Sequence, residues 1–144
     1  MKMSSLVGLV AAGLLVSNAA LAEDHMVMTK LTSFEPLVIQ IKPGDQVVWR
    51  GMTGHSTNSL LIPDGAKPWA STLGEDYVHK FDKPGAYLYD CTPHSSMGMV
   101  GVVLVGDGMP ANYKDLEAKA KHGPAHRAFV KMKQYLKAKG IAAN

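Results

Sequence analysis

Cysteine is almost missing from this sequence, with Cys91 the single one among 144 residues. One thiol cannot close an internal disulfide, so the sequence excludes a disulfide-stapled miniprotein. Charge of one sign is also scarce, because 15 Lys and Arg stand against 12 Asp and Glu. This small excess excludes the strongly basic composition typical of nucleic-acid-binding domains. At this length, and with 47% hydrophobic residues, the chain is neither a disordered tail nor a large multidomain enzyme.

A long hydrophobic run occurs only at the amino terminus. Lys2 precedes an unbroken run of Leu, Val, Ala and Gly from Leu6 to Val16, and the segment closes with Ala20-Leu21-Ala22. The run is too short to span a bilayer, which needs about 20 residues, and its ending is typical of a signal-peptidase site. We therefore predict that residues 1–22 are a signal peptide that is removed, and that residues 23–144 are exported to the periplasm.

Short apolar segments separated by Pro-Gly turns make up the chain from residue 23 to residue 111. This pattern predicts an all-β Greek-key sandwich. The last apolar segment has a single break, at Gly101, and should therefore be a central strand. The expected strands are 25–28, 37–41, 47–49, 77–81, 86–89 and 100–105.

The composition changes after Pro110, where two helices are predicted. The first spans residues 113–121, with Asn112 as its N-cap. The second begins at Pro124, in the first turn where proline is favoured. Its apolar side chains recur at helical spacing and should pack on the sandwich. They are Phe129, Met132 and Leu136.

Charge divides the chain at the same place. Residues 23–111 carry a net charge of −4 and residues 112–144 a net charge of +6. We predict a sandwich over 23–111 and a helical extension over 112–144 with a basic face toward water. The two parts are expected to form a single domain.

The chemically informative segment lies between the last two predicted strands. Within nine residues it contains a thiol, Cys91, an imidazole, His94, and two thioethers, Met97 and Met99. A second imidazole, His55, lies in a glycine-rich turn that also follows a strand, and Greek-key connections can bring two such loops together. Soft sulfur ligands favour Cu(I) and imidazoles suit Cu(II). The set therefore predicts a mononuclear copper site.

Other chemistries explain these residues less well. A thiol enzyme would use Cys91 as nucleophile with His55 or His94 as base, but it leaves Met99 without a role. Structural zinc prefers sites with more cysteine, and Met is a poor zinc ligand. A copper oxidase needs His on both sides of the Cys, and neither neighbour of Cys91 is His. A periplasmic copper carrier or chaperone that uses the same residues is the non-redox alternative.

The segment Cys91-Thr92-Pro93-His94, followed by Met97-Gly98-Met99, resembles the ligand loop of type 1 blue copper proteins (cupredoxins), in particular the pseudoazurins. Plastocyanins share the Cys-to-Met spacing and amicyanins the Cys-Thr-Pro-His start, but neither has the two carboxyl-terminal helices. The resemblance implies a cupredoxin-like domain over residues 23–144. It is also seen at 23–27, 34–36, 43–45 and 99–101.

The resemblance implies that His55, Cys91 and His94 are the strong equatorial ligands of one type 1 copper ion. Amicyanin-like spacing would select Met97 as the weak axial ligand, whereas pseudoazurin-like spacing selects Met99. The residues that follow Met97 match the pseudoazurin pattern, so Met99 is the expected axial ligand. The ring edge of His94 is expected near the surface, where electrons would leave.

The same resemblance implies a soluble periplasmic one-electron carrier rather than an enzyme, monomeric and without membrane insertion or nucleic-acid binding. The implied partner is a periplasmic redox protein, such as a copper nitrite reductase or a cytochrome c. Transient docking calls for a small interface. We expect an apolar patch around Pro93, Met97 and His94, ringed by lysines such as Lys42 and Lys83 that steer an acidic partner.

Two features depart from the pseudoazurin pattern. Asn usually follows the first ligand His and fixes the loop that carries the Cys; here Ser56 follows His55, and Asn58 comes two places later. The hairpin between Lys30 and Phe34 is also shortened. Hydrogen bonds around a metal ligand tune the metal, so these departures bear on the reduction potential rather than on copper binding.

Overall fold

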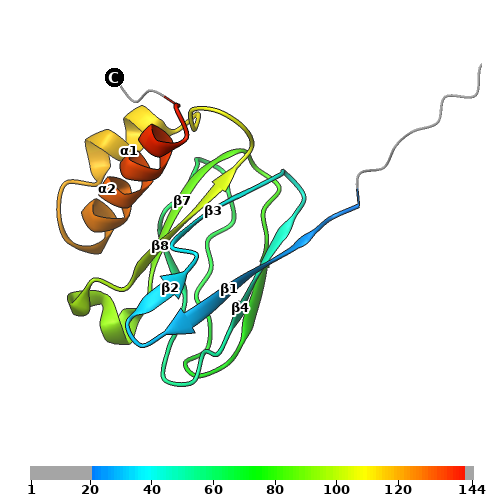
Figure 1. Cartoon of the computed structure of the whole chain (residues 1–144), viewed down its shortest axis with the longest axis vertical. Coiled ribbons are helices and arrows are strands. Elements are labelled where there is room, and N and C mark those ends of the chain that lie inside the picture. Colours follow the sequence, from blue (N-terminus) through cyan, green and yellow to red (C-terminus); the bar gives the residue numbers. More distant parts are fainter. Residues whose placement is uncertain (1–20, 142–144) are drawn as a thin grey trace, which may run out of the picture.

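The computed structural model describes residues 21–141 as two facing β-sheets with two helices packed on one of them (Figure 1). The predicted signal peptide, residues 1–22, lies almost wholly outside the described residues. No helix within residues 21–141 is long and apolar enough to cross a membrane. The strands are β1 (Asp24–Lys30), β2 (Ser33–Glu35), β3 (Val38–Ile41), β4 (Gln46–Arg50), β5 (Asn58–Leu61), β6 (Tyr77–Lys80), β7 (Gly85–Asp90) and β8 (Val100–Val105). The helices are the 3-10 helix η1 (Thr92–Met97), α1 (Tyr113–Lys119) and α2 (Gly123–Ala138).

Each sheet contains four strands and mixes parallel with antiparallel pairs. The strand orders are β2-β1-β4-β6 and β3-β8-β7-β5. In each sheet one pair is parallel, β1 with β4 and β3 with β8. The prediction of an all-β sandwich with two carboxyl-terminal helices is confirmed.

Six of the eight strands lie in the segments expected from the sequence, with ends that differ by at most two residues. The other two, β2 and β5, are short and contain polar residues, so no clear apolar alternation marks them. Strand β8 lies between β3 and β7 with all six residues buried, as its apolar sequence predicts.

An aromatic cluster fills the space between the sheets. The ring centroid of Trp49 in β4 lies 5.4 Å from the ring centroid of Tyr89 in β7 and 5.8 Å from that of Trp69. Tyr89 is paired across the ladder with Gly101, where any Cβ would lie 2.1 Å from Tyr89 Cζ. Glycine at this position therefore leaves room for the ring that fixes β7, the strand leading to Cys91, in the core.

The two helices cover the outer face of the sheet that contains β7 and β8 (Figure 1). As predicted, α2 buries Phe129, Met132 and Leu136 against this face. Asn112 stands at the N-cap position of α1, as predicted, but its side chain makes no capping hydrogen bond. Its Oδ1 accepts the N–H of Ala86 at 2.8 Å and its Nδ2 donates to the Ala86 carbonyl at 2.9 Å. The amide has both a donor and an acceptor, so it can satisfy both backbone groups of a strand residue, which a capping oxygen cannot.

Strands β4 and β7 determine which residues reach the end of the sandwich that holds the predicted ligands His55 and Cys91, called the metal-binding end below. His55 follows β4 and Cys91 follows β7, whereas Lys42 and Lys83 precede these strands. Strands of five and six residues extend over roughly 16–20 Å. The expectation that Lys42 and Lys83 ring His94 is therefore wrong, because strand direction places both lysines at the opposite end.

Candidate metal centre

A short, closed loop carries Cys91, His94 and Met99. Cys91 is the first residue after β7 and has extended backbone angles, and Pro93 stands in the first turn of η1. The loop closes at its base, where Cys91 N–H donates to the Met99 carbonyl at 3.0 Å. Gly98 ends η1 with a φ of 86°, a left-handed conformation that glycine adopts without strain. Proline at the start and glycine at the end thus fix the loop locally.

Three of the four predicted ligands converge around one sulfur atom. Cys91 Sγ lies 3.6 Å from His55 Nδ1 and 3.4 Å from His94 Nδ1. The donor atoms of these three residues all lie within 4.8 Å of one another. Cys91 and His55 are buried, whereas the ring of His94 is partly exposed. The tertiary fold therefore joins His55 to a loop 36 residues away.

The donor set fits copper. Burial lowers the pKa of His55, and the neighbouring His94 lowers it further, so the imidazole stays neutral and keeps a lone pair for a metal. The cluster offers one sulfur and two imidazole nitrogens and no carboxylate. Soft sulfur combined with imidazole suits copper in both oxidation states, whereas Mg²⁺ and Ca²⁺ require oxygen ligands.

Met97 and Met99 differ sharply in exposure. Met99 is fully buried and belongs to the same core cluster as Cys91. The side chain of Met97 is 64% exposed at the surface of η1. Of the two thioethers, Met99, which the pseudoazurin pattern predicts as the axial ligand, is thus buried in the core, and Met97 faces water.

A network of hydrogen bonds surrounds the thiol where the sequence departs from the family pattern. The backbone N–H of Ser56 points at Cys91 Sγ from 3.5 Å. Ser56 Oγ accepts from Thr92 N–H at 3.3 Å and from Asn58 Nδ2 at 2.9 Å. Asn58 Nδ2 also donates to Thr92 Oγ1 at 2.7 Å. Two side chains, Ser56 and Asn58, together tie the His55 turn to the Cys91 loop.

A further contact reaches the ligand loop from α2. The guanidinium of Arg127 donates from Nη2 to the Ser95 carbonyl, and its Cδ would lie 3.7 Å from a Cβ at Gly98. Sequence reasoning missed this residue because 32 positions separate Arg127 from Ser95 and no local pattern links a helix to a distant carbonyl. The helical extension therefore supports the loop as well as covering the sheet.

Apolar side chains are exposed near His94. Pro93 and Met97 are exposed, and Leu73, 61% exposed, lies in a loop whose Gly74 N–H donates to the His55 carbonyl at 2.9 Å. Pro93 and Met97 are thus exposed on the loop of His94, as the predicted patch requires, and Leu73 is a further exposed apolar side chain near His55.

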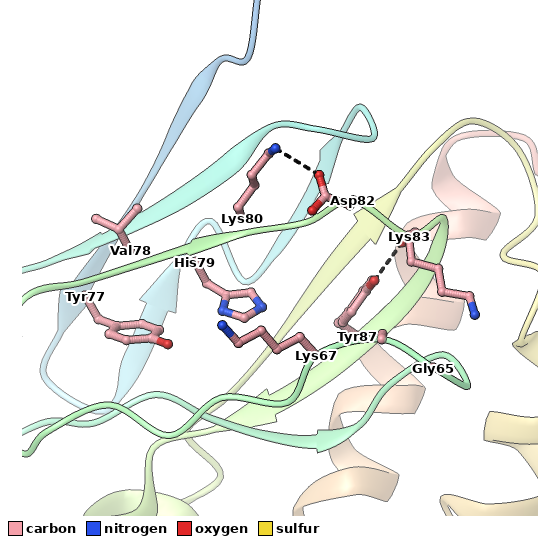
Figure 2. A pocket seen from close by; sticks show the side chains of 10 residues that line it. Gly65, Lys67, Tyr77, Val78, His79, Lys80, Asp82, Lys83 and Tyr87 are labelled. Carbon is pink, nitrogen blue, oxygen red and sulfur yellow. Dashed lines mark hydrogen bonds and ion pairs between the residues drawn. The ribbon is translucent and has the colours of Figure 1, made fainter.

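A separate cavity lies along β6, away from the metal-binding end. Figure 2 shows its lining, which includes Lys67, His79, Lys83 and Tyr87, and its volume is about 490 Å³. The Tyr87 hydroxyl donates to the Lys83 carbonyl at 2.7 Å, and Lys80 pairs with Asp82 at 3.1 Å. None of the converging donor atoms lines this cavity.

Comparison with known proteins agrees with the class that the fold and the site define, a copper protein with a Greek-key sandwich. The model of the plastocyanin/azurin family of copper-binding proteins matches residues 22–106. The chain belongs to this family. Its fold, its two helices and its relatives place it among the pseudoazurin-type cupredoxins, which are copper electron carriers.

The similarity to individual relatives covers most of the chain. The chain is 41% identical over 120 residues to a protein described as a pseudoazurin from Rhizobium leguminosarum bv. viciae, covering 76% of this chain and 78% of that protein. The pseudoazurin structure from Sinorhizobium meliloti aligns with a TM-score of 0.65 at 31% identity, covering 77% of this chain and 97% of the other. The pseudoazurin structure from Methylobacterium extorquens AM1 aligns with a TM-score of 0.66 at 29% identity, covering 81% of this chain and 98% of the other.

Proposed function

We propose that residues 23–144, exported to the periplasm after removal of residues 1–22, carry single electrons between redox proteins on one type 1 copper ion. His55, Cys91 and His94 are the strong ligands and Met99 is the weak axial ligand. The convergence of two Nδ1 atoms on a buried thiol, at 3.4 and 3.6 Å, is the observation that carries this proposal.

The residues of the chain have separate tasks in this function. When bound, copper supplies a centre that gains or loses one electron. Cys91 and His55 are held in the core, and backbone bonds across the loop, with those from Ser56 and Arg127, keep the donors in place. Such a rigid set changes little between two oxidation states, which favours fast transfer.

The path to a partner runs through His94. Its ring is the part of the donor set that is partly exposed, and the apolar patch around it excludes water from a docked complex. The partner we propose is a periplasmic redox protein, a copper nitrite reductase or a cytochrome c, which meets this monomer transiently. The small apolar patch supports a weak, quickly reversed contact, and no substrate chemistry is assigned to the chain itself.

The test is the visible absorption and electron paramagnetic resonance of the exported chain with one equivalent of Cu(II). We expect an intense thiolate-to-copper band and a narrow copper hyperfine splitting. Cys91→Ser should abolish the band, because the charge-transfer donor is gone, whereas Ser96→Ala on the same loop should leave it unchanged. A blue Cys91→Ser protein would refute the ligand assignment.

A copper-exchange measurement separates the electron carrier from a copper chaperone. The buried thiol predicts that Cu(I) is retained against a chelator for hours. Release of Cu(I) within minutes would instead favour a copper carrier or chaperone over an electron carrier.

A further inference from the structure

A second group of metal-binding side chains lies at the other end of the sandwich. Glu23, His25 and Asp45 each offer a donor atom, and these atoms lie within 4.8 Å of one another. Asp24, where β1 starts, is paired with Gln46, where β4 starts, so this group is separated from His55 by the length of β4. Roughly 16 Å of strand therefore lies between the two groups.

Asp45 holds both the backbone nitrogen of Glu23 and the ring of His25. Glu23 N–H donates to Asp45 Oδ1 at 3.0 Å, and His25 Nε2 lies 2.8 Å from Asp45 Oδ2. Lys42 N–H also donates to Asp45 Oδ2 at 3.0 Å, so backbone N–H groups reach both oxygens of this carboxylate, which acts as an acceptor. His25 Nε2 must then carry the hydrogen, and in the neutral ring Nδ1 keeps the lone pair. Within residues 21–141, His25 Nδ1 makes no hydrogen bond.

Cleavage after Ala22 would turn the nitrogen of Glu23 into a primary amine. The mature chain would then begin Glu23-Asp24-His25. An amine, two amide nitrogens and an imidazole at the third position can close three fused chelate rings around one ion. Four nitrogens in a plane suit Cu(II) and Ni(II), whose preferred geometry is square-planar or tetragonal.

We propose that the processed amino terminus, Glu23-Asp24-His25, is a second metal site that binds one Cu(II) or Ni(II) ion through the Glu23 amine, the Asp24 and His25 amides and His25 Nδ1. The inference rests on the proposed export and cleavage, but not on the type 1 ligands. Asp45 orients the ring of His25 by accepting its Nε2–H, because a metal-bound His commonly donates its other ring N–H to a carboxylate.

The fold permits this chelate if the first residues of β1 give up their backbone hydrogen bonds to β4. Binding removes the two amide protons and the ammonium proton, and the resulting complex of a divalent ion with two amide anions is neutral. Lys42 and Lys80, which line the adjacent depression, therefore oppose it only weakly. The amides of Asp24 and His25 must leave any bond to β4. Strand β2 pairs with β1 only from Met28 onward, so this end of β1 is held on one side alone.

The experiment uses the full 144-residue chain, exported, purified, loaded with copper and titrated with Ni(II). Mass spectrometry must show Glu23 as the first residue, and one equivalent of Ni(II) should give a yellow, diamagnetic square-planar complex with release of protons. His25→Ala should abolish it, whereas His122→Ala, which changes an exposed His at the start of α2, should not. Asp45→Asn should weaken Ni(II) binding about 10- to 100-fold.

Insertion of one Gly between Glu23 and Asp24 tests the chelate itself. It leaves the cleavage site and the His25–Asp45 pair in place but moves the imidazole to the fourth position, so Ni(II) binding should be lost. Unchanged binding by the insertion variant, a different first residue, or no binding by the processed chain would each overturn the site. The blue band is recorded in the same samples, so failure of the type 1 centre is seen separately.

Discussion

At the scale of single residues, Ser56 and Asn58 show how this chain replaces one asparagine by two side chains. Ser56 supplies the N–H that points at Cys91 Sγ and the oxygen that receives Thr92 N–H. Asn58 donates to both Ser56 Oγ and Thr92 Oγ1. The departure from the pseudoazurin pattern therefore preserves the link between the two loops.

Asn58→Ala should lower the reduction potential and speed copper loss. The side chain that holds Ser56 against Thr92 would be gone, so the N–H bond to the thiolate would weaken and the more negative sulfur would stabilise Cu(II). Cyclic voltammetry and chelator competition measure the two effects. Ser96→Ala is the matched control, and equal potentials for the two variants would contradict a tuning role for Asn58.

The lowered pKa of Asp45 predicts how the free energy of unfolding depends on pH. Its pKa is about 2 in the folded protein, below its usual 3.8, because Glu23 N–H and His25 donate to it. The unfolded chain therefore binds more protons between these values, and the stabilisation, complete above about pH 4, is lost as the pH falls toward 2. Urea unfolding from pH 5 to pH 2 should show this loss, and Asp45→Asn should flatten it. Parallel curves for both proteins would contradict the assignment.

At the scale of elements, α2 combines two roles that a helical sequence pattern shows only in part. Its apolar face, which the spacing of Phe129, Met132 and Leu136 predicts, packs on β7 and β8. Its other contact, from Arg127 to the loop of His94, depends on where the helix lies and is invisible in the sequence.

Leu136→Ala should destabilise the fold by about 2–5 kcal/mol, since it leaves a cavity at a fully buried position. Lys137→Ala, one residue further along and exposed, should change stability by less than about 0.5 kcal/mol. Chemical unfolding measures both. A small effect of Leu136→Ala would show that α2 contributes little to the core.

At the scale of the whole molecule, the two ends of the sandwich have different surfaces. The end with His94 exposes Pro93, Met97 and Leu73, whereas Lys42 and Lys83 lie at the other end, because β4 and β7 run away from them. Two ion pairs lie near the metal-binding end, Lys30 with Glu35 and Arg50 with Asp76. We therefore expect docking at this end to depend on apolar contact more than on a ring of lysines.

Met97→Asp should slow electron transfer to a partner while leaving the copper spectrum unchanged. A carboxylate in the apolar patch must lose water on docking, and a cost of about 1.4 kcal/mol corresponds to a tenfold loss in binding. Val78→Asp, on the 47% exposed side chain of β6, is the control on another face. Stopped-flow transfer to a purified redox partner measures the rates, and equal slowing by both variants would rule out a docking role for the patch.

The sequence by itself determined the elements and the chemistry of the donors. Pro-Gly turns and apolar runs marked six strands, helical spacing marked α2, and the short segment from Cys91 to Met99 carried its own loop geometry, because these signals are local. Only the tertiary structure decided which distant residues meet and which side chains are buried. It brought His55 to the thiol, buried Met99 and exposed Met97, joined the Asn112 side chain to the backbone of β7, and placed Lys42 and Lys83 at the far end. Strand direction and burial depend on pairings between residues distant in sequence, which local patterns do not specify.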